Sequence, residues 1–88
     1  MFIELQTTAF QRSMKLNAGT TFQLIGTIGT SVITFEQPDG AGGWTTIILD
    51  GVNQELSATN TIVSFFQPAL IRINKPVTVA TAGVMMVS

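Results

Sequence analysis

The residues that most enzymes use for acid, base and nucleophilic chemistry are missing from this chain. It contains no His and no Cys, so histidine-based triads, thiolate nucleophiles and the commonest metal ligands are excluded. Five carboxylates and four basic residues remain among 88 positions. Their types and spacing predict no catalytic residue, no bound cofactor and no enzyme activity.

The carboxylates offer two weaker possibilities, a general acid-base pair and a calcium loop. Glu36 and Glu55 could act as a pair only if the fold brought them together, and their spacing gives no sign of this. The segment Asp50 to Glu55, DGVNQE, carries oxygen ligands but lacks the alternating pattern of an EF-hand loop. Asp39 and Asp50 each precede a glycine, a position where Asp favours a turn. We therefore expect structural roles for these carboxylates and no metal site.

The charge distribution excludes two further classes of partner. The net charge is -1 at pH 7, and neither sign of charge forms a run along the chain. Non-specific binding to nucleic acid needs a concentrated basic surface, so no nucleic-acid partner is expected. No apolar span reaches the length of about 18 residues that a bilayer requires, and the first ten residues do not read as a leader peptide. The sequence therefore predicts no membrane partner.

Scarcity of charge is the most unusual feature of the composition. Charged residues make up 10% of the chain, against about 25% in typical soluble domains. A chain of 88 residues has a small core, and without Cys or His it has neither disulfides nor a zinc site to support that core. Association with other copies or with a larger protein remains, so we expect a homo-oligomer.

Short alternating apolar segments, separated by turn residues, run through the whole chain. The central one is Thr30 to Leu49, where two β-branched runs flank Pro-Asp-Gly-Ala-Gly-Gly and predict a hairpin. Its second arm, Trp44 to Leu49, carries bulky apolar groups on both faces. Val52 to Asn60 holds at most a short strand around Gln54 to Leu56. Further strands are expected at Phe2 to Thr8, Ser13 to Asn17, Thr20 to Ile25, Thr61 to Phe66, Leu70 to Asn74, Val77 to Ala80 and Val84 to Ser88.

This pattern predicts an all-β protein with a single domain over residues 1–88. Turn signals recur every 8 to 12 residues or so, and no window has the period of a helix. We expect a small antiparallel β-sandwich or jelly-roll-like barrel with about seven to nine short strands.

Strands that are apolar on both faces supply the candidate contact residues. Phe65 and Phe66 are adjacent in one strand and must point to opposite faces, so only one of the two rings can enter the core. Met85 and Met86 fit adaptable packing at either place. The predicted interface residues are Trp44, Phe66, Ile47 and Leu49, with Phe2 and Ile3 as a possible arm.

Trp44, the single Trp of the chain, leaves three interpretations open. It could open a strand as a core residue, anchor an interface, or stack on a sugar. The last interpretation would use Asn53, Gln54 and Asn60 as amide partners. It would make the protein a carbohydrate-binding module, or an adhesin or tail accessory protein.

The order of strands and turns from Thr20 to Ser88 resembles that of small virion proteins of tailed bacteriophages. The segments that carry the resemblance are Val32-Ile33-Thr34-Phe35-Glu36, Pro38-Asp39-Gly40-Ala41-Gly42-Gly43-Trp44, Ile71-Arg72-Ile73 and Val77-Thr78-Val79. The resemblance implies a capsid decoration (cement) or head accessory protein, a homotrimer that binds and stabilises the lattice of the major capsid protein. It also implies synthesis in the host cytoplasm and a place on the capsid surface of the virion. The family offers no catalytic residue to carry over, and the first two expected strands lie outside the match.

Overall fold

The structure is a computed structural model that describes residues 3–17 and 19–87, with Ile3 described by its backbone alone. Within these residues the chain is all-β and contains no helix. Its eleven strands are β1 (Ile3–Gln6), β2 (Phe10–Leu16), β3 (Thr20–Gly26), β4 (Ile33–Pro38), β5 (Trp44–Thr46), β6 (Ile48–Leu49), β7 (Val52–Asn53), β8 (Glu55–Leu56), β9 (Ile62–Phe65), β10 (Ala69–Lys75) and β11 (Ala82–Met86).

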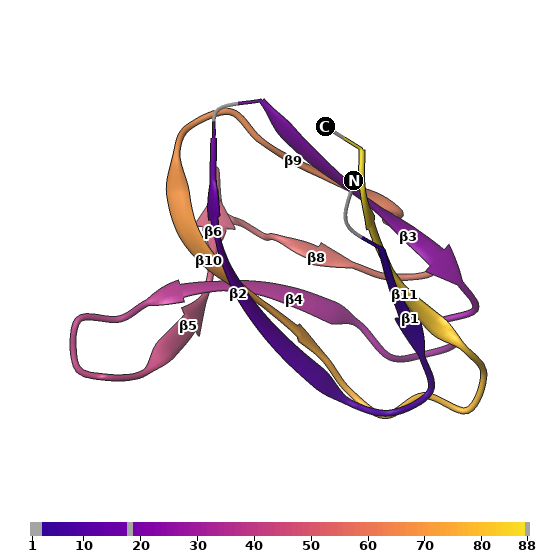
Figure 1. Cartoon of the computed structure of the whole chain (residues 1–88). Helices are drawn as coiled ribbons and strands as arrows, with labels where there is room; N and C mark the ends of the chain where they lie inside the picture. The colour runs from indigo at the N-terminus through magenta and orange to yellow at the C-terminus, as the bar shows by residue number, and fades with distance from the viewer. Residues whose placement is uncertain (1–2, 18, 88) are drawn as a thin grey trace.

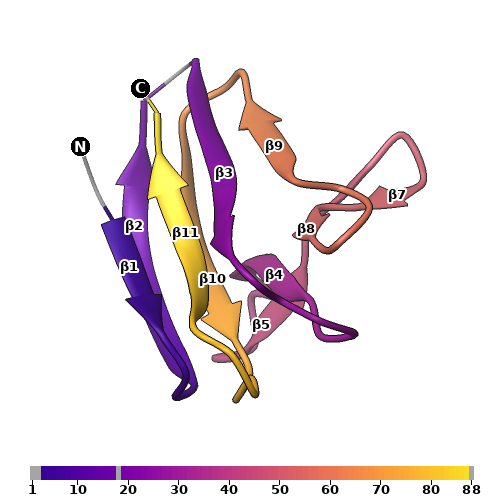
Figure 2. The ribbon, with the colours of Figure 1, turned by 90° about the vertical axis from the view of Figure 1, so that its right-hand side faces the viewer.

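Two antiparallel sheets face each other as a β-sandwich. The first sheet has the order β1-β11-β3-β9, and the second has the order β2-β10-β4-β5, with β8 also paired to β4. Strands β6 and β7 form a separate small hairpin beside them. Figure 2 shows β1, β11, β3 and β9 as one layer, with β2 and β10 in the layer behind. The predicted all-β sandwich is therefore confirmed.

The core is built from residues of both sheets. Phe22 of β3, Phe35 of β4 and Phe65 of β9 form an aromatic cluster across the interior, with ring centroids 5.0, 5.5 and 6.1 Å apart. In β10 the alternation is regular: Ile71 and Ile73 are fully buried, whereas Arg72 between them points outward. The expected strand from Leu70 to Asn74 thus crosses the core with Arg72 on its outer face.

Phe65 and Phe66 behave as their adjacency predicts. Phe65 is 5% exposed and its ring lies in the aromatic cluster, whereas Phe66, the residue after β9, is 78% exposed. Because neighbouring side chains of a strand point to opposite faces, burying one ring forces the other out.

The hairpin of β4 and β5 belongs to the second sheet, and its tip projects beyond the rest of the molecule (Figure 1). At its tip the Asp39 carboxylate accepts hydrogen bonds from the backbone N–H groups of Ala41 and Gly43, at 2.7 and 3.0 Å. These bonds lower the pKa of Asp39, that from Ala41 most of all. Gly40 and Gly42 adopt positive φ angles of 83° and 87°. Asp39 and the glycines thus make the turn that the sequence predicts.

The second arm of this hairpin is not the single strand that the sequence predicts. It divides at Ile47, whose N–H donates to the Phe35 carbonyl at 2.8 Å and whose carbonyl accepts from the Gln54 N–H at 2.8 Å. Beyond this point β6 turns away to pair with β7, through an Asp50-Gly51 turn with positive φ at both residues. This division, with two short strands after the turn, brings the strand count to eleven instead of seven to nine. It also gives Ile47 and Leu49 different environments.

Val77 to Ala80 is the second departure, because this segment is a loop and not a strand. Its cause is Lys75, which is fully buried at the end of β10. The Lys75 ammonium donates hydrogen bonds to the carbonyls of Thr8 and Pro76, at 3.0 and 2.9 Å, and to the Thr78 hydroxyl at 3.1 Å. We call these three acceptors the Lys75 cage. They tie the β1–β2 turn and the β10–β11 loop (residues 76–81) to one buried cation.

Replacing Lys75 with Met removes all three hydrogen bonds of the cage while keeping an unbranched chain. We expect the free energy of unfolding to fall by about 1–3 kcal/mol, because the acceptors lose a charged donor. Urea denaturation, followed by the fluorescence of Trp44, measures this change. Lys15→Met at an exposed position of β2 is the matched control and should stay within about 0.5 kcal/mol of the parent protein. A K75M protein as stable as its parent would contradict the role of the cage.

The stability of the protein should also rise on the alkaline side. Burial lowers the pKa of Lys75 from its ordinary value of 10.5, so the folded state releases this proton at a lower pH than the unfolded chain. Between the lowered pKa and 10.5 the unfolded chain binds more protons, and the free energy of unfolding therefore increases with pH. The chain has no Tyr, Cys or His. The free energy of unfolding of K75M should not increase over the same pH range. An equal increase in K75M would show that a group other than Lys75 causes it.

Candidate functional site

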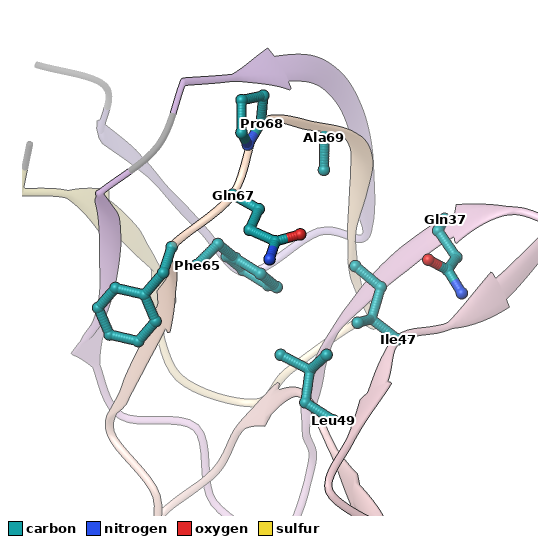
Figure 3. A pocket seen from close by; sticks show the side chains of 8 residues that line it. Gln37, Ile47, Leu49, Phe65, Gln67, Pro68 and Ala69 are labelled. Carbon is teal, nitrogen blue, oxygen red and sulfur yellow. The ribbon is translucent and has the colours of Figure 1, made fainter.

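An apolar pocket of about 340 Å³ lies where β10 begins, between the β9–β10 connection and the segment around β6. Figure 3 shows Ile47 and Leu49 on one side of this pocket and the Phe65 to Ala69 segment on the other. The lining contains no charged side chain. The residues that line it are Gln37, Ile47, Leu49, Phe65, Phe66, Gln67, Pro68 and Ala69.

The local structure explains how each wall of the pocket arises. Ile47 interrupts the hairpin arm and is buried at the base, held by its two backbone hydrogen bonds. Leu49 follows in β6 and is 46% exposed, because β6 has left the sheet. On the opposite wall Phe66 is left outside the core by Phe65, and Pro68 separates β9 from β10. The result is a hollow with a buried aliphatic floor and exposed apolar rims.

The pocket brings together three of the six residues predicted to form an interface: Ile47, Leu49 and Phe66. Trp44 does not line it. Ile3 belongs to β1 of the other sheet, where its backbone pairs with Met85. Phe2 lies outside the residues that the structure describes. Of the predicted interface residues, only Ile47, Leu49 and Phe66 therefore share one surface, the pocket and its rim.

Trp44 takes part in a polar cluster on the outer face of the second sheet. The Arg72 guanidinium lies 5.0 Å from the centre of the Trp44 ring, within the range of a cation–π contact. Arg72 also forms an ion pair with Glu36, with an Nη2 to Oε1 distance of 2.7 Å, and its Nε donates to the same oxygen at 2.8 Å. Trp44 is half-buried and does not belong to the buried core cluster. Its burial alone does not distinguish between an interface residue and a sugar-stacking residue.

A second, polar hollow lies beside the small hairpin and includes Asn53 and Asn60 but not Trp44. The Asn60 side-chain amide donates to the Glu55 carbonyl at 2.7 Å, and that of Gln54 donates to the Val52 carbonyl at 3.0 Å. These two amides are therefore engaged with the backbone. The tryptophan and the amides do not converge on one pocket, as a sugar site built from them would require.

The carboxylates show no arrangement for metal binding in the described part of the chain. No group of three or more acidic side chains is placed to hold a cation there. Glu55 lies opposite Thr34, so it shares a face of the second sheet with Glu36, but the Glu36 carboxylate is bound to Arg72. No helix among these residues is long and apolar enough to cross a membrane.

Several residues of the pocket have no role in the predictions from the sequence. Gln67, Pro68 and Ala69 lie between or at the edge of the expected strands Thr61 to Phe66 and Leu70 to Asn74, yet they form one wall. Pro68 predicts a turn between the two strands. The sequence does not show that this turn will face Ile47 and Leu49, because their position depends on the division of the hairpin arm at Ile47. That division rests on contacts distant in sequence, and alternation alone does not reveal it.

Serine substitutions should separate the floor of the pocket from its rims. Ile47→Ser places a hydroxyl in the core, and we expect a loss of about 2–4 kcal/mol in the free energy of unfolding. Leu49→Ser and Phe66→Ser change exposed side chains, so each should cost about 0.5 kcal/mol or less. Denaturant titration of the three variants measures this. A large loss in F66S would show that Phe66 supports the fold and is not a free surface residue.

The chain matches no protein-family model, no curated protein and no solved structure. The function of the site must therefore be inferred from its own residues. These offer an uncharged apolar hollow with an exposed aromatic rim, and no cluster suited to metal binding among the described residues. Such a surface is suited to binding another protein.

Proposed function

We propose that this protein is a non-enzymatic structural protein of a virion, which associates with copies of itself and decorates a lattice of a major capsid protein. The observation that carries the proposal is the exposed apolar rim of the pocket, formed by Leu49 and Phe66 beside the buried Ile47. The choice of a capsid lattice as the partner rests on the family resemblance of the segments from Thr20 to Ser88.

The energetics of the rim support binding to a large partner. Burying a Leu or Phe side chain contributes about 1.5–3 kcal/mol, so the two rim residues contribute enough for a weak contact and not for a tight one. A capsid lattice compensates for weak contacts, because an oligomer that engages several lattice sites at once gains affinity through effective concentration. A closed oligomer with one rim per copy would therefore bind much more tightly than a single copy.

The position of the charges supports the same proposal. The pocket lining has no charged residue, and Arg72 and Glu36 neutralise each other on the outer face of the second sheet. Docking through the pocket therefore buries no unpaired charge, which would be costly. Salt screens charge interactions and leaves apolar burial intact, so the binding to the lattice should persist at high ionic strength.

The alternative function, sugar binding as a carbohydrate-binding module or an adhesin or tail accessory protein, has less support. The polar hollow that contains Asn53 and Asn60 could accept a hydroxylated ligand, but Trp44 does not line it. Arg72 lies over the Trp44 ring that a sugar would use for stacking. The geometry therefore favours the structural role.

The proposal is tested by co-sedimentation with empty heads of tailed phages from which accessory proteins have been removed. We expect the parent protein to sediment with its cognate heads at both low and high salt. The double variant Leu49→Ser with Phe66→Ser should bind at least about 100-fold more weakly, because it loses two apolar contacts. The variant Ile62→Ser changes an equally exposed residue on the outer face of the other sheet and serves as the control.

Two results would contradict the proposal. One is a failure to bind any head of a broad panel. The other is binding that L49S/F66S retains in full, since the rim would then have no part in it. A glycan array tests the alternative function. Sugar binding that Trp44→Ala abolishes would support a carbohydrate-binding protein and contradict the structural role.

A further inference from the structure

Two Asp-Gly pairs occur in the chain, Asp39-Gly40 and Asp50-Gly51, and both lie at the turns of hairpins. At such a pair the backbone nitrogen of the glycine can attack the side-chain carboxyl carbon of the aspartate, because no Cβ on the glycine hinders its approach. Each glycine has a positive φ angle and open space where a Cβ would stand. The two pairs are therefore alike in sequence and in access, and they differ in what holds the aspartate.

The Asp39 carboxylate is held by its own loop. Its Oδ1 accepts hydrogen bonds from the N–H groups of Ala41 and Gly43, at 2.7 and 3.0 Å, and the Asp39 N–H donates to the Gly43 carbonyl at 3.1 Å. The bond from Ala41, followed by that from Gly43, lowers the pKa of Asp39 and keeps its carboxylate ionised. An ionised carboxylate expels its oxygen far less readily than the neutral acid does. The Asp39-Gly40 pair is therefore protected from attack.

The Asp50 carboxylate has no such support. No described residue donates a hydrogen bond to it or forms an ion pair with it. Asp50 and Gly51 have φ angles of 53° and 78°, as the two central residues of a type I′ turn require. Asp50 is the one residue other than glycine, within the described part of the chain, that has a positive φ. This region of φ is unfavourable for a residue with a side chain, so the turn places a strained aspartate before a glycine.

The hairpin that carries this pair can open without disturbing the sandwich. Strands β6 and β7 pair Ile48 with Asn53 and Leu49 with Val52, and all four residues are exposed. Figure 2 shows β7 and its turn projecting beyond β8 and β9. Short exposed hairpins open locally at a small cost in free energy. The Gly51 nitrogen can thus reach the Asp50 side chain while both sheets remain intact.

We propose that Asp50 is a site of spontaneous covalent modification, at which it converts through a cyclic succinimide to isoaspartate. The Gly51 nitrogen bonds to Cγ of Asp50, and the proton of this nitrogen leaves with the hydroxyl group of Cγ as water. Hydrolysis then adds one water to the ring. Addition at Cγ restores aspartate, whereas addition at the backbone carbonyl carbon of Asp50 leaves the chain running through the side chain. The reaction needs no reagent other than water, and its product keeps one free carboxylate.

Isoaspartate at this position changes the rim of the apolar pocket. The isoaspartyl link adds one methylene to the backbone of a two-residue turn, so the turn no longer fits the register that pairs Leu49 with Val52. Leu49 is one of the two exposed rim residues. The effect on docking rests on the proposed function of this rim, whereas the conversion of Asp50 does not. Aged protein should therefore bind the lattice more weakly than freshly made protein.

Digestion with an endoprotease that cleaves before aspartate, but not before isoaspartate, tests the conversion at both pairs at once. The protein is incubated in its folded state at neutral pH and is denatured before digestion. We expect cleavage before Asp50 to be lost at least about tenfold faster than cleavage before Asp39, because the Asp39 carboxylate must first give up its hydrogen bonds. Cleavage before Asp50 that persists, or an equally fast loss before Asp39, would overturn the inference.

Gly51→Asn is the matched variant. Asn adopts positive φ more readily than most residues with a side chain, and a Cβ at position 51 would meet no atom within 4 Å, so the turn should be retained. The new side chain stands beside the attacking nitrogen, and the conversion of Asp50 should slow by at least about tenfold. A G51N protein that converts as fast as its parent would also overturn the inference.

Binding to heads separates the modification from its effect on docking. The converted protein, once purified, should bind heads at least about tenfold more weakly than the parent protein, because Leu49 leaves the rim. Full binding of the converted protein would overturn the effect on the rim. Conversion of Asp50 in a protein that binds no head would support the modification and contradict the proposed function.

Discussion

Contact between Phe22, Phe35 and Phe65 joins the two sheets, and the remaining structure depends on it. The three rings come from β3, β4 and β9 and meet with centroid distances of 5.0 to 6.1 Å, in tilted and edge-to-face arrangements. Each ring fixes the register of its strand relative to the interior, since a shift of one residue would turn the ring to solvent. Phe66 is exposed because Phe65 is buried, so the surface of the protein follows from its core.

The sequence predicts those features that depend on neighbours in the chain. The alternation around Ile71, Arg72 and Ile73, the opposite positions of Phe65 and Phe66, and the Asp50-Gly51 turn are all local, and the structure has each of them. Three of the six residues predicted for an interface, Ile47, Leu49 and Phe66, line one pocket, although Ile47 and Leu49 do not share a strand.

The features that the sequence does not predict depend on distant partners. Lys75 is buried although no pattern in the neighbouring sequence indicates it, because the carbonyl of Thr8, 67 positions away, accepts from its ammonium. The same cage turns the expected strand from Val77 to Ala80 into a loop. The hairpin arm divides because Ile47 bonds to Phe35 and Gln54 instead of continuing a ladder. Alternation predicts which side chains share a face of a strand, whereas the long-range hydrogen bonds of Lys75 and Ile47 decide where strands end.

The scarcity of charge has a structural meaning once these positions are known. The rim of the pocket, Leu49 and Phe66, exposes apolar groups on a chain in which 10% of the residues are charged. Apolar surface with few charges around it promotes association with other proteins. The pocket lies at the start of β10 and the buried Lys75 at its end, so one strand joins the apolar hollow to the polar cage. From Leu70 to Lys75 the side chains of β10 alternate between the outer face and the core, so the register of this strand fixes both sites together.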